Sequence, residues 1–453
     1  MEFAGKRVLV VGLGKSGLSV CRYLCGQDAL VRVSELRQKE TLDRSVVEGI
    51  AQLGAGLEAG GHRSETFLGS EMIIVSPGVP LDIDSLNDAR DARIPILGEM
   101  ELASRLIDIP IAAITGTNGK STTTALLGAM ANKAGRRTFV GGNIGTPFID
   151  CVLDNPEAEV AVVEVSSFQL DAMETFCPDI SMILNLSPDH LDRYRDYEAY
   201  VASKLRIFEN QGPANFLILN DDDERLSRIG TNSGVVVLRY GLEAAEKRHA
   251  FLEKRKLRAF LPGGASFEFA LGRFRPPGKH NLQNLMGAVL AGLALGLEGG
   301  LIQEAIDSFR GLPHRVEFVG RFGEVDFYDD SKATNVEAAA RSVEGFDRPV
   351  ILIAGGRHKG ADYGPLVEAS RGRVTEAILL GESRALLQAS FEGIVPIRLA
   401  ETMEEAVSLA FVAANPQDVV LLAPACSSFD MFTDYVHRGR VFRETVERVG
   451  HGH

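Results

Sequence analysis

The chain has 453 residues, 45% of them hydrophobic and 24% charged, with a formal net charge of −13 at pH 7. This length predicts two or three domains with the composition of a soluble globular enzyme. The negative charge argues against general affinity for nucleic acid or anionic membranes, and no apolar run approaches the ~20 residues of a membrane-spanning helix. Five cysteines without a C-x-x-C pair, and no visible targeting segment, predict a cytoplasmic protein.

The first nucleotide signal lies near the N-terminus. Residues 7–17 combine a buried-strand run with the turn GLGKSG, and a helix pattern follows. The spacing matches the dinucleotide fingerprint G-x-G-x-x-G, and Glu35 ends the next strand near the position of its acidic residue. The motif does not choose between NAD and another nucleotide, and a glycine turn that only packs a helix is the alternative. With a further strand at 72–78, we predict a small α/β domain over residues 1–105.

A second signal lies in residues 111–134, where an apolar strand leads through a glycine-rich turn into a helix. Loop N–H groups and the helix dipole would face an anion. Lys120 would reach the β- and γ-phosphates of a nucleotide, and the Ser121 hydroxyl would hold Mg²⁺. Ile114 stands where the strict pattern G-x-x-x-x-G-K-[ST] has its first glycine, so the loop is a shortened variant. The alternative is a plain glycine turn with a surface lysine.

Polar side chains follow the next strands. One apolar run ends at Glu164, and another ends at Asn185 shortly before His190. The carboxyl ends of parallel strands meet at one edge of a sheet, so Glu164 and His190 are candidate Mg²⁺ ligands beside the phosphate loop. A helix-capping glutamate and a structural histidine are the alternatives. A helix is expected over 196–209, where spacing alone makes Lys204 an ordinary solvated lysine.

The rest of this domain is less specific. Strands are expected at 215–220 and 235–241, with a hairpin over 256–271 and a charged, exposed segment over 243–256. Residues 278–284 open a long helix, and their polar side chains could cap it or read the edge of a base.

After a helix at 301–310, the segment Gly311–Arg315 reads as an interdomain hinge, which ends a central domain over 106–313. Residues 314–453 then alternate strands and helices in a second parallel-sheet pattern. Polar residues gather after several of its strands, at 330–335, 355–360 and 425–430, as in the usual floor of an α/β site.

In order along the chain, these blocks resemble the Mur ligases of peptidoglycan precursor synthesis. The resemblance rests on GLGKSG, SPG, ITGTNGKSTT, GGNIGTP, VEVSSFQL, LNLSPDHLDRY, YVASK, HNLQN, LPHR, DDSKATN, GGRHKG and APACSSFDMF. It implies an α/β protein of three domains: N-terminal Rossmann-like, central with a phosphate-loop ATPase-like parallel sheet, and C-terminal Rossmann-like. The implied activity is ATP-dependent amide-bond formation through an acyl phosphate.

The DSKATN and ACSSFD blocks, with the dinucleotide-like first domain, are similar to those of the D-glutamate-adding members. The implied substrates are UDP-N-acetylmuramoyl-L-alanine, D-glutamate and ATP, with no nucleic acid or membrane partner, and a monomer is expected. The alternatives are a ligase adding another amino acid, a folylpolyglutamate-type enzyme, a phosphate-loop regulatory ATPase and an NAD-dependent oxidoreductase.

The resemblance also implies roles for matching residues. Those around the ATP phosphates are Gly116, Thr117, Asn118, Gly119, Lys120, Ser121 and Thr122. Those around adenine, ribose and phosphates are Asn284, Arg315, Asp330 and Lys332. Ser121 and Glu164 would hold one Mg²⁺, and His190 and a carbamylated Lys204 the second. Lys120, Glu164, His190 and Lys204 are thus the implied catalytic residues.

On the substrate side, the implied uridine-diphosphate contacts are Leu13, Lys15, Ser16, Glu35, Arg37 and Gly78. Asn143 would lie near the muramoyl-alanine part. Thr334, Ser428 and a buried cation, Lys359, would hold D-glutamate, with Tyr435 nearby. Two positions depart from the pattern: Glu35 stands where one branch has Asp, and Tyr435 stands where Phe is common.

Overall fold

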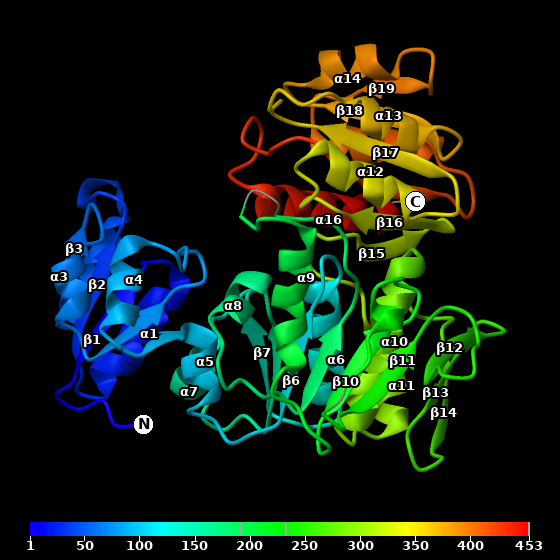
Figure 1. The fold of residues 1–453 in the computed structure, drawn as a ribbon. Coiled ribbons are helices and arrows are strands. Elements are labelled where there is room, and N and C mark those ends of the chain that lie inside the picture. The colour runs from blue at the N-terminus through cyan, green and yellow to red at the C-terminus, as the bar shows by residue number, and fades with distance from the viewer. Residues whose placement is uncertain (191–192, 232, 452–453) are drawn as a thin grey trace. The chain divides into compact units, whose positions relative to one another are not determined.

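The computed structural model describes residues 1–190, 193–231 and 233–451. These residues form three β-sheets with helices between their strands (Figure 1), so the expected three-domain α/β class is confirmed. The chain divides into two compact units, residues 1–270 with 283–305, and residues 271–282 with 306–453. The domain limits expected at residues 105 and 313 stay predictions. Within the described ranges, no helix is long and apolar enough to cross a membrane.

The N-terminal sheet is entirely parallel and has the order β3-β2-β1-β4-β5. Its strands are β1 (Arg7–Val11), β2 (Leu30–Glu35), β3 (Gly56–Ala59), β4 (Met72–Val75) and β5 (Ile96–Gly98). Its helices are α1 (Lys15–Gly26), α2 (Arg44–Gln52), α3 (Ser64–Leu68) and α4 (Asp84–Asp91). Strand β4 is shorter than the predicted 72–78 because Pro77, which has no N–H, cannot continue the ladder.

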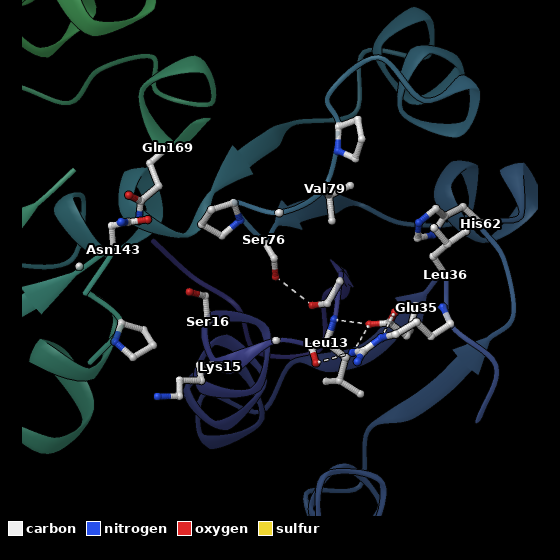
Figure 2. Close-up of a pocket in the computed structure, with 18 of the residues that line it drawn as sticks. Leu13, Lys15, Ser16, Glu35, Leu36, His62, Ser76, Val79, Asn143 and Gln169 are labelled. Carbon is white, nitrogen blue, oxygen red and sulfur yellow. Dashed lines mark hydrogen bonds and ion pairs between the residues drawn. The ribbon is translucent and has the colours of Figure 1, made fainter. Parts of the chain in front are cut away.

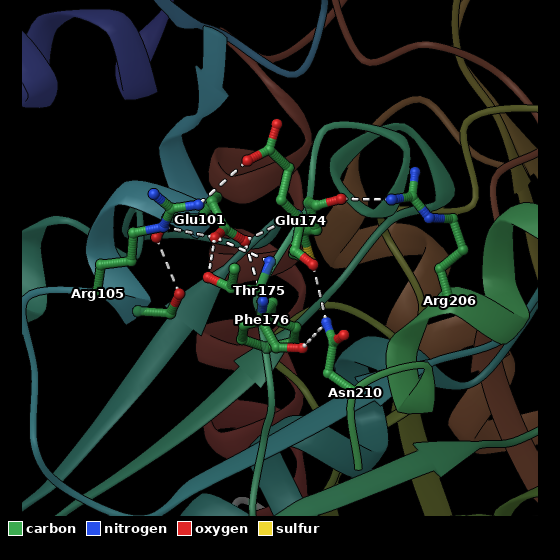
Figure 3. A network of polar contacts seen from close by, with 9 residues as sticks. Glu101, Arg105, Glu174, Thr175, Phe176, Arg206 and Asn210 are labelled. Carbon is green, nitrogen blue, oxygen red and sulfur yellow. Dashed lines mark hydrogen bonds and ion pairs between the residues drawn. The ribbon is translucent and has the colours of Figure 1, made fainter. Parts of the chain in front are cut away.

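Helix α5 (Glu99–Ser104) is fixed to the central part of the same unit by a buried carboxylate (Figure 3). Glu101 is fully buried and accepts the backbone N–H groups of Glu174, Thr175 and Phe176, each at 3.1 Å. Arg105 adds an ion pair at 2.6 Å. A carboxylate with this many donors is well compensated for burial, so the network holds α5 in one position.

The central sheet has the order β14-β13-β12-β11-β10-β9-β6-β8-β7. Its strands are parallel except at one edge, where β12 pairs with β13 and β13 with β14 in antiparallel fashion. Its strands are β6 (Ile111–Thr115), β7 (Thr138–Gly142), β8 (Val160–Glu164), β9 (Ile180–Ile183), β10 (Phe216–Asn220), β11 (Val236–Tyr240), β12 (Ala250–Glu253), β13 (Lys256–Phe260) and β14 (Ser266–Ala270). The exposed segment predicted at 243–256 is therefore wrong in part, because it contains β12. The strand is short, and only Ala250 within it is buried, which left little hydrophobic pattern to detect.

The helices of this part are α6 (Lys120–Lys133), α7 (Asp150–Asp154), α8 (Ser167–Asp171), α9 (Tyr197–Leu205), α10 (Lys279–Ala294) and α11 (Gly299–Ser308). A capping box formed by Ser166 and Gln169 begins α8. Asp196 caps α9 by accepting the N–H of Ala199 at 2.8 Å. These caps fix where the polar residues after β8 and β9 leave the sheet.

The C-terminal sheet has the order β15-β16-β20-β17-β18-β19, parallel except for the β15–β16 pair. Its strands are β15 (Glu317–Phe322), β16 (Val325–Asp329), β17 (Val350–Gly355), β18 (Val374–Leu380), β19 (Ile397–Leu399) and β20 (Val419–Leu422). Its helices are α12 (Val336–Glu344), α13 (Gly364–Ser370), α14 (Arg384–Phe391), α15 (Met403–Ala413) and α16 (Tyr435–His451). The antiparallel β15 was not predicted.

The segment 271–282 belongs with this C-terminal sheet rather than with the hairpin that precedes it. Its Arg275 carbonyl accepts the Tyr328 hydroxyl at 3.2 Å, and the Arg275 guanidinium lies 5.1 Å from the centre of the Phe318 ring. The second unit is therefore built from two separate stretches of chain.

Candidate active site

The turn between β6 and α6 has the backbone that a phosphate loop needs. Gly116 and Gly119 have φ of 151° and 86°, which favour glycine. A Cβ on Gly119 would also lie 2.3 Å from Oδ1 of Asn284, which is buried near the start of α10. The glycines thus allow this close approach and leave the N-terminus of α6 behind the loop, an arrangement suited to anions.

The loop is braced by the segment after β9. The N–H of Asn118 donates to Asn185 Oδ1 at 2.8 Å, and Asn185 Nδ2 donates back to the Asn118 carbonyl at 3.0 Å. Thr117 Oγ1 accepts the N–H of Ser187 and lies 3.0 Å from the Tyr200 hydroxyl. The loop is therefore held by side chains from two other elements.

Glu164 is buried at the end of β8 and connects two candidate residues. Its carboxylate accepts the Ser121 hydroxyl at 2.7 Å and the Asn143 amide at 2.8 Å. Lys120 lies on the same loop, and its Nζ donates to the carbonyls of Gly116 and Thr117 at 2.9 and 3.0 Å. Hydroxyl and carboxylate oxygens are ligands that Mg²⁺ prefers, so Ser121 and Glu164 are suited to hold one ion.

Lys204 is only 2% exposed, so the solvated lysine predicted from spacing is wrong. Its Nζ donates to the Gly116 carbonyl at 3.0 Å and lies 4.8 Å from the centre of the Tyr200 ring. Burial, and then the nearby positive charge of Lys120, lower the pKa of Lys204 to about 7. The amine is therefore partly neutral at ordinary pH, beside the phosphate loop.

His190 lies at the start of the turn after β9, in the left-handed region with φ of 53°. Its exposed ring has its centre 4.9 Å from that of Phe168 and 6.3 Å from that of Tyr200. His190 and Lys204 therefore both lie near the Tyr200 ring.

A pocket of about 480 Å³ gathers the candidate residues that follow β1, β2 and β4 together with residues of the central sheet (Figure 2). Among the residues that line it are Leu13, Lys15, Ser16, Glu35, Arg37, Gly78 and Asn143. These are the positions expected around the nucleotide-linked substrate. What occupies the pocket stays a prediction.

Glu35 forms a buried charged centre in one wall of this pocket. Its carboxylate accepts the Leu13 N–H at 2.7 Å and both the backbone N–H and Nε of Arg37, at 3.0 and 2.9 Å. Burial alone would raise the pKa of Glu35, but these hydrogen bonds outweigh it and hold the pKa at about 2. Glu35 is therefore ionised at all physiological pH values.

His62 and Gln169 also line the pocket but were not among the candidates predicted from the sequence. His62 lines it and pairs its Nδ1 with the Ser34 hydroxyl at 2.8 Å, and Gln169 lines the opposite side from the start of α8. The S-x-x-Q spacing of Ser166 and Gln169 was a usable local signal for a capping box. Nothing local pointed to His62, because it follows a short strand and meets the pocket only in the folded sheet.

In the second unit, Asp330 follows β16 and is buried. It accepts the Val316 N–H at 3.2 Å and the Ser342 hydroxyl, and burial raises its pKa to about 7. Arg315 and Lys332 are exposed. The Lys332 Nζ lies 5.7 Å from the centre of the Tyr435 ring.

The loops that carry Lys359 and Ser428 are joined by an antiparallel bridge between Arg357 and Ser427. Ser428 is buried and Thr334 is half-buried, but Lys359 is exposed, so the expectation of a buried cation at this position is wrong. Lys359 lies in a glycine-flanked loop between β17 and α13, outside the packed strands and helices of the second unit.

The buried cation of this region is Arg438, which is 2% exposed. Its guanidinium donates to the Ser331 hydroxyl and carbonyl at 3.0 and 2.9 Å and to the Cys426 carbonyl at 3.2 Å. Arg438 thereby connects the loop that contains Ser331 (DSKATN) to the loop that contains Cys426 (ACSSFD). Sequence reasoning missed it because an arginine on an amphipathic helix is usually solvated.

Comparison with known families gives three consecutive matches. The Mur ligase MurD-like N-terminal domain matches residues 6–98, the Mur ligase middle domain residues 114–292, and the Mur ligase glutamate ligase domain residues 314–426. The UDP-N-acetylmuramoylalanine–D-glutamate ligase of Acidobacterium capsulatum is 44% identical over 98% of this chain and 97% of its own length. The enzyme of that name from Geotalea daltonii is 40% identical over 100% and 99%.

The chain belongs to the Mur ligase family.

Solved structures agree at the level of the fold. A UDP-N-acetylmuramate-alanine ligase from Thermotoga maritima matches with a TM-score of 0.56 at 19% identity, over 98% of this chain and 100% of that one. A pseudomurein peptide ligase type C from Methanothermus fervidus matches with a TM-score of 0.54 at 20% identity, over the same shares. The Mur ligase architecture is therefore shared.

The candidate residues of this Mur ligase are divided between its two units. The first unit carries the phosphate loop, Glu164, His190, Lys204, Asn284 and the pocket around Glu35. The second unit carries Arg315, Asp330, Lys332, Thr334, Lys359, Ser428 and Tyr435. Their roles stay predictions.

Proposed function

We propose that this Mur ligase uses ATP to join D-glutamate to the alanyl carboxylate of UDP-N-acetylmuramoyl-L-alanine. The observation that carries the proposal is the full-length similarity, at 40–44% identity, to relatives named as ligases of that reaction. A phosphate loop and a separate pocket suited to a nucleotide-linked substrate in the first unit support it.

The nucleotide-linked substrate would lie in the pocket around Glu35. Its diphosphate would face the N-terminus of α1, where backbone N–H groups and the helix dipole favour an anion, with Lys15 and Ser16 beside it. Asn143, on the central side of the pocket, also donates to Glu164. Asn143 would therefore connect the far end of this substrate to the phosphate loop.

The phosphate loop would hold ATP, with Lys120 released from its loop carbonyls to the β- and γ-phosphates. Ser121 and Glu164 would hold one Mg²⁺, since their oxygens already lie within 2.7 Å of each other. A bound Mg²⁺ would offset negative charge on the phosphates. Lys120 would do the same from the protein side as charge develops on the transferring group.

Lys204 would become a second acidic ligand through carbamylation. Its neutral amine, available because the pKa is about 7, would attack the carbon of CO₂ and lose a proton, giving an N-linked carboxylate. With His190 nearby around Tyr200, this carboxylate would form a second cation site. Conversion from cation to anion would also remove its repulsion with Lys120.

The reaction would proceed in two balanced steps. The alanyl carboxylate oxygen would attack the γ-phosphorus, giving an acyl phosphate and ADP. The D-glutamate amine would then attack the acyl carbon, lose a proton and expel inorganic phosphate to leave the amide. Because the acyl phosphate hydrolyses readily, the site must exclude water while it exists. We place the reaction in the cytoplasm because it consumes ATP.

The test is phosphate release from ATP and UDP-N-acetylmuramoyl-L-alanine with one amino acid at a time. We expect release with D-glutamate and far less with L-glutamate, because the mirror image misplaces the amine or leaves a charge unpaired, at about 1–3 kcal/mol per group. L-alanine and diaminopimelate should give little. A preference for any of these three would overturn the D-glutamate assignment. That the protein is a monomer stays a prediction, which a measurement of its molar mass in solution by light scattering would check.

For the carbamate, Lys204→Ala should be nearly inactive and partly restored by acetate, which supplies a small carboxylate. The intact mass of the wild-type protein in bicarbonate should show one added carboxylate, and Lys204→Ala should not. A free amine with full activity in bicarbonate would contradict the carbamate alone and leave the ligase proposal standing.

A further inference from the structure

Arg193 connects the turn that carries His190 to a wall of the nucleotide pocket. The N–H groups of Arg193 and Tyr194 both donate to the His190 carbonyl at 3.0 Å. The Arg193 guanidinium donates to the carbonyls of Gly78 and Val79, at 3.4 and 3.0 Å. These two carbonyls follow β4 in the N-terminal sheet, whereas Arg193 follows β9 in the central sheet.

The segment whose carbonyls accept the Arg193 hydrogen bonds is part of the pocket. Gly78 and Val79 line it, and the preceding Ser76 donates its hydroxyl to the Gly12 carbonyl at 2.9 Å. A Cβ on Gly12 would lie 2.8 Å from a methyl group of Val79, so the segment packs directly on the glycine turn. Movement of this segment would therefore change the width of the pocket.

The other face of the Arg193 guanidinium packs on helix α8. Its guanidinium carbon lies 4.1 Å from the centre of the Phe168 ring, a cation–π contact. Phe168 stands on α8, only four positions after Glu164, and stacks on Tyr194 with 5.8 Å between ring centres. A planar guanidinium can stack on a ring and donate at its edge at once, which an ammonium does less well.

From this geometry we infer that Arg193 is a positioning residue for the nucleotide-sugar substrate. It holds the Gly78–Val79 wall against the central sheet, so that the pocket stays aligned with the elements that carry Glu164 and His190. The inference rests on the proposed function for the identity of the ligand. The contacts of Arg193 lie apart from the phosphate loop, so it should affect binding of the nucleotide sugar more than binding of ATP.

The kinetic test compares Arg193→Ala with Arg193→Lys and with Arg195→Ala. Arg195 is a matched control, because it lies on the same segment and its exposed side chain pairs only with the adjacent Asp196 among the ion pairs of the described residues. We expect Arg193→Ala to raise the KM for UDP-N-acetylmuramoyl-L-alanine about 10-fold, with less than a 3-fold change in kcat and in the KM for ATP. Arg193→Lys should be intermediate, and Arg195→Ala should match wild type.

A second measurement needs no substrate. The Val79 N–H donates to the Ser76 carbonyl at 3.0 Å, so hydrogen exchange of the peptide containing residues 76–79 reports on the wall. In the ligand-free protein, the amide hydrogens of this peptide should exchange faster in Arg193→Ala than in wild type. In Arg195→Ala they should exchange at the wild-type rate. Exchange in α10 should stay unchanged, which excludes general unfolding.

Unchanged exchange in Arg193→Ala would overturn the inference. So would faster exchange with an unchanged KM for the nucleotide sugar, or an equal rise in the KM for ATP. If wild type releases no phosphate with the proposed substrates, the proposed function fails instead, and exchange with and without added UDP then decides whether Arg193 still holds the wall of a nucleotide pocket.

Discussion

At the N-terminus of α6, Lys120 curls back onto the carbonyls of Gly116 and Thr117. Its charge serves no core packing, so Lys120→Ala should leave the fold intact. It should lower ligation at least ~10²-fold, as expected for one lost transition-state contact. The measurement is phosphate release with all substrates, alongside thermal unfolding.

Lys133 provides the matched control at the other end of the same helix, where it forms an ion pair with Glu304 at 3.3 Å. Lys133→Ala should retain full activity. Ligation by Lys120→Ala within a few-fold of wild type would remove the phosphate-loop hypothesis.

Glu35 allows a pH test at the same scale. Its pKa lies near 2 in the folded protein and near 4.5 in an unfolded chain, so its stabilisation is present above pH 4.5 and lost as pH falls toward 2. In Glu35→Gln, an amide N–H₂ must face an N–H donor of Leu13 or Arg37. Losing the Leu13 bond should lower the free energy of unfolding at pH 7 by about 1.5–3 kcal/mol.

Melting temperatures of wild type and Glu35→Gln, measured from pH 7 down to pH 3, check this. The difference should be largest above pH 5 and shrink on acidification, whereas Glu35→Asp, which keeps the charge, should follow wild type. A difference that is constant with pH would mean that the Glu35 charge does not stabilise the fold.

Single residues were predictable where their signal is local. The phosphate loop could be located because Gly116 and Gly119 sit at fixed offsets between a strand and a helix. The burial of Lys204 could not, since it depends on Thr115, 89 positions earlier, and on the packing of α9. The same holds for Arg438, whose partners Ser331 and Cys426 come together only in the folded sheet.

At the scale of elements, helix α5 carries two buried glutamates with opposite pKa shifts. Burial raises the pKa of Glu99 to about 7, and among the described residues one of its carboxylate oxygens, Oε2, has no hydrogen-bond partner. Burial also opposes ionisation of Glu101, but hydrogen bonds from Thr175, Glu174 and Arg105 lower its pKa overall. One helix therefore provides a test with two opposite outcomes.

Glu99→Gln keeps an acceptor for the Ile149 N–H and removes the titration. Because the pKa of Glu99 is raised in the folded protein, the free energy of unfolding of wild type falls as pH rises from 4.5 to 7. The free energy of unfolding of Glu99→Gln, relative to wild type, should therefore rise over that range. Above pH 7 the gain should level off, at an upper limit of about 3 kcal/mol. Denaturant unfolding at pH 5 and pH 8 measures it.

Glu101→Gln should behave in the opposite way, because it breaks a satisfied network. We expect it to destabilise at pH 8 by about 1–3 kcal/mol and to approach wild type below pH 4.5. Equal effects of the two substitutions at pH 8 would contradict the assigned environments.

Elements with a strong hydrophobic pattern were predicted well, and the others were missed for physical reasons. The strands β1, β6 and β8 are almost continuously buried, so their apolar runs stand out. In β15 buried and partly exposed positions mix around a bulge between Phe318 and Gly320, which hides the period of a strand. The short β12 lies among many charged residues, and these hide its strand pattern too.

At the scale of the whole molecule, the candidate residues for ATP and for D-glutamate belong largely to different units. The phosphate loop and the pocket proposed for the acceptor both belong to the first unit, so ATP use should depend on the acceptor. Without UDP-N-acetylmuramoyl-L-alanine, ADP formation should be at least ~10²-fold slower than ligation, because the phosphoryl group has no carboxylate to accept it.

With that substrate but no D-glutamate, we expect at most one equivalent of ADP per enzyme in a rapid-quench experiment, followed by slow turnover. A steady ATPase rate without acceptor, as high as the ligation rate, would favour the phosphate-loop switch instead.

The second unit includes residues 271–282 as well as the chain from Ile306 onward, and Arg275 contacts both Phe318 and Tyr328. The polypeptide thus passes from one unit to the other more than once, and a gene cut at a single junction near residue 313 would separate Arg275 from its partners. Chimeras that exchange amino-acid specificity between relatives should therefore transplant both stretches from the same parent, so that recombination between family members is restricted to matched pairs of crossovers.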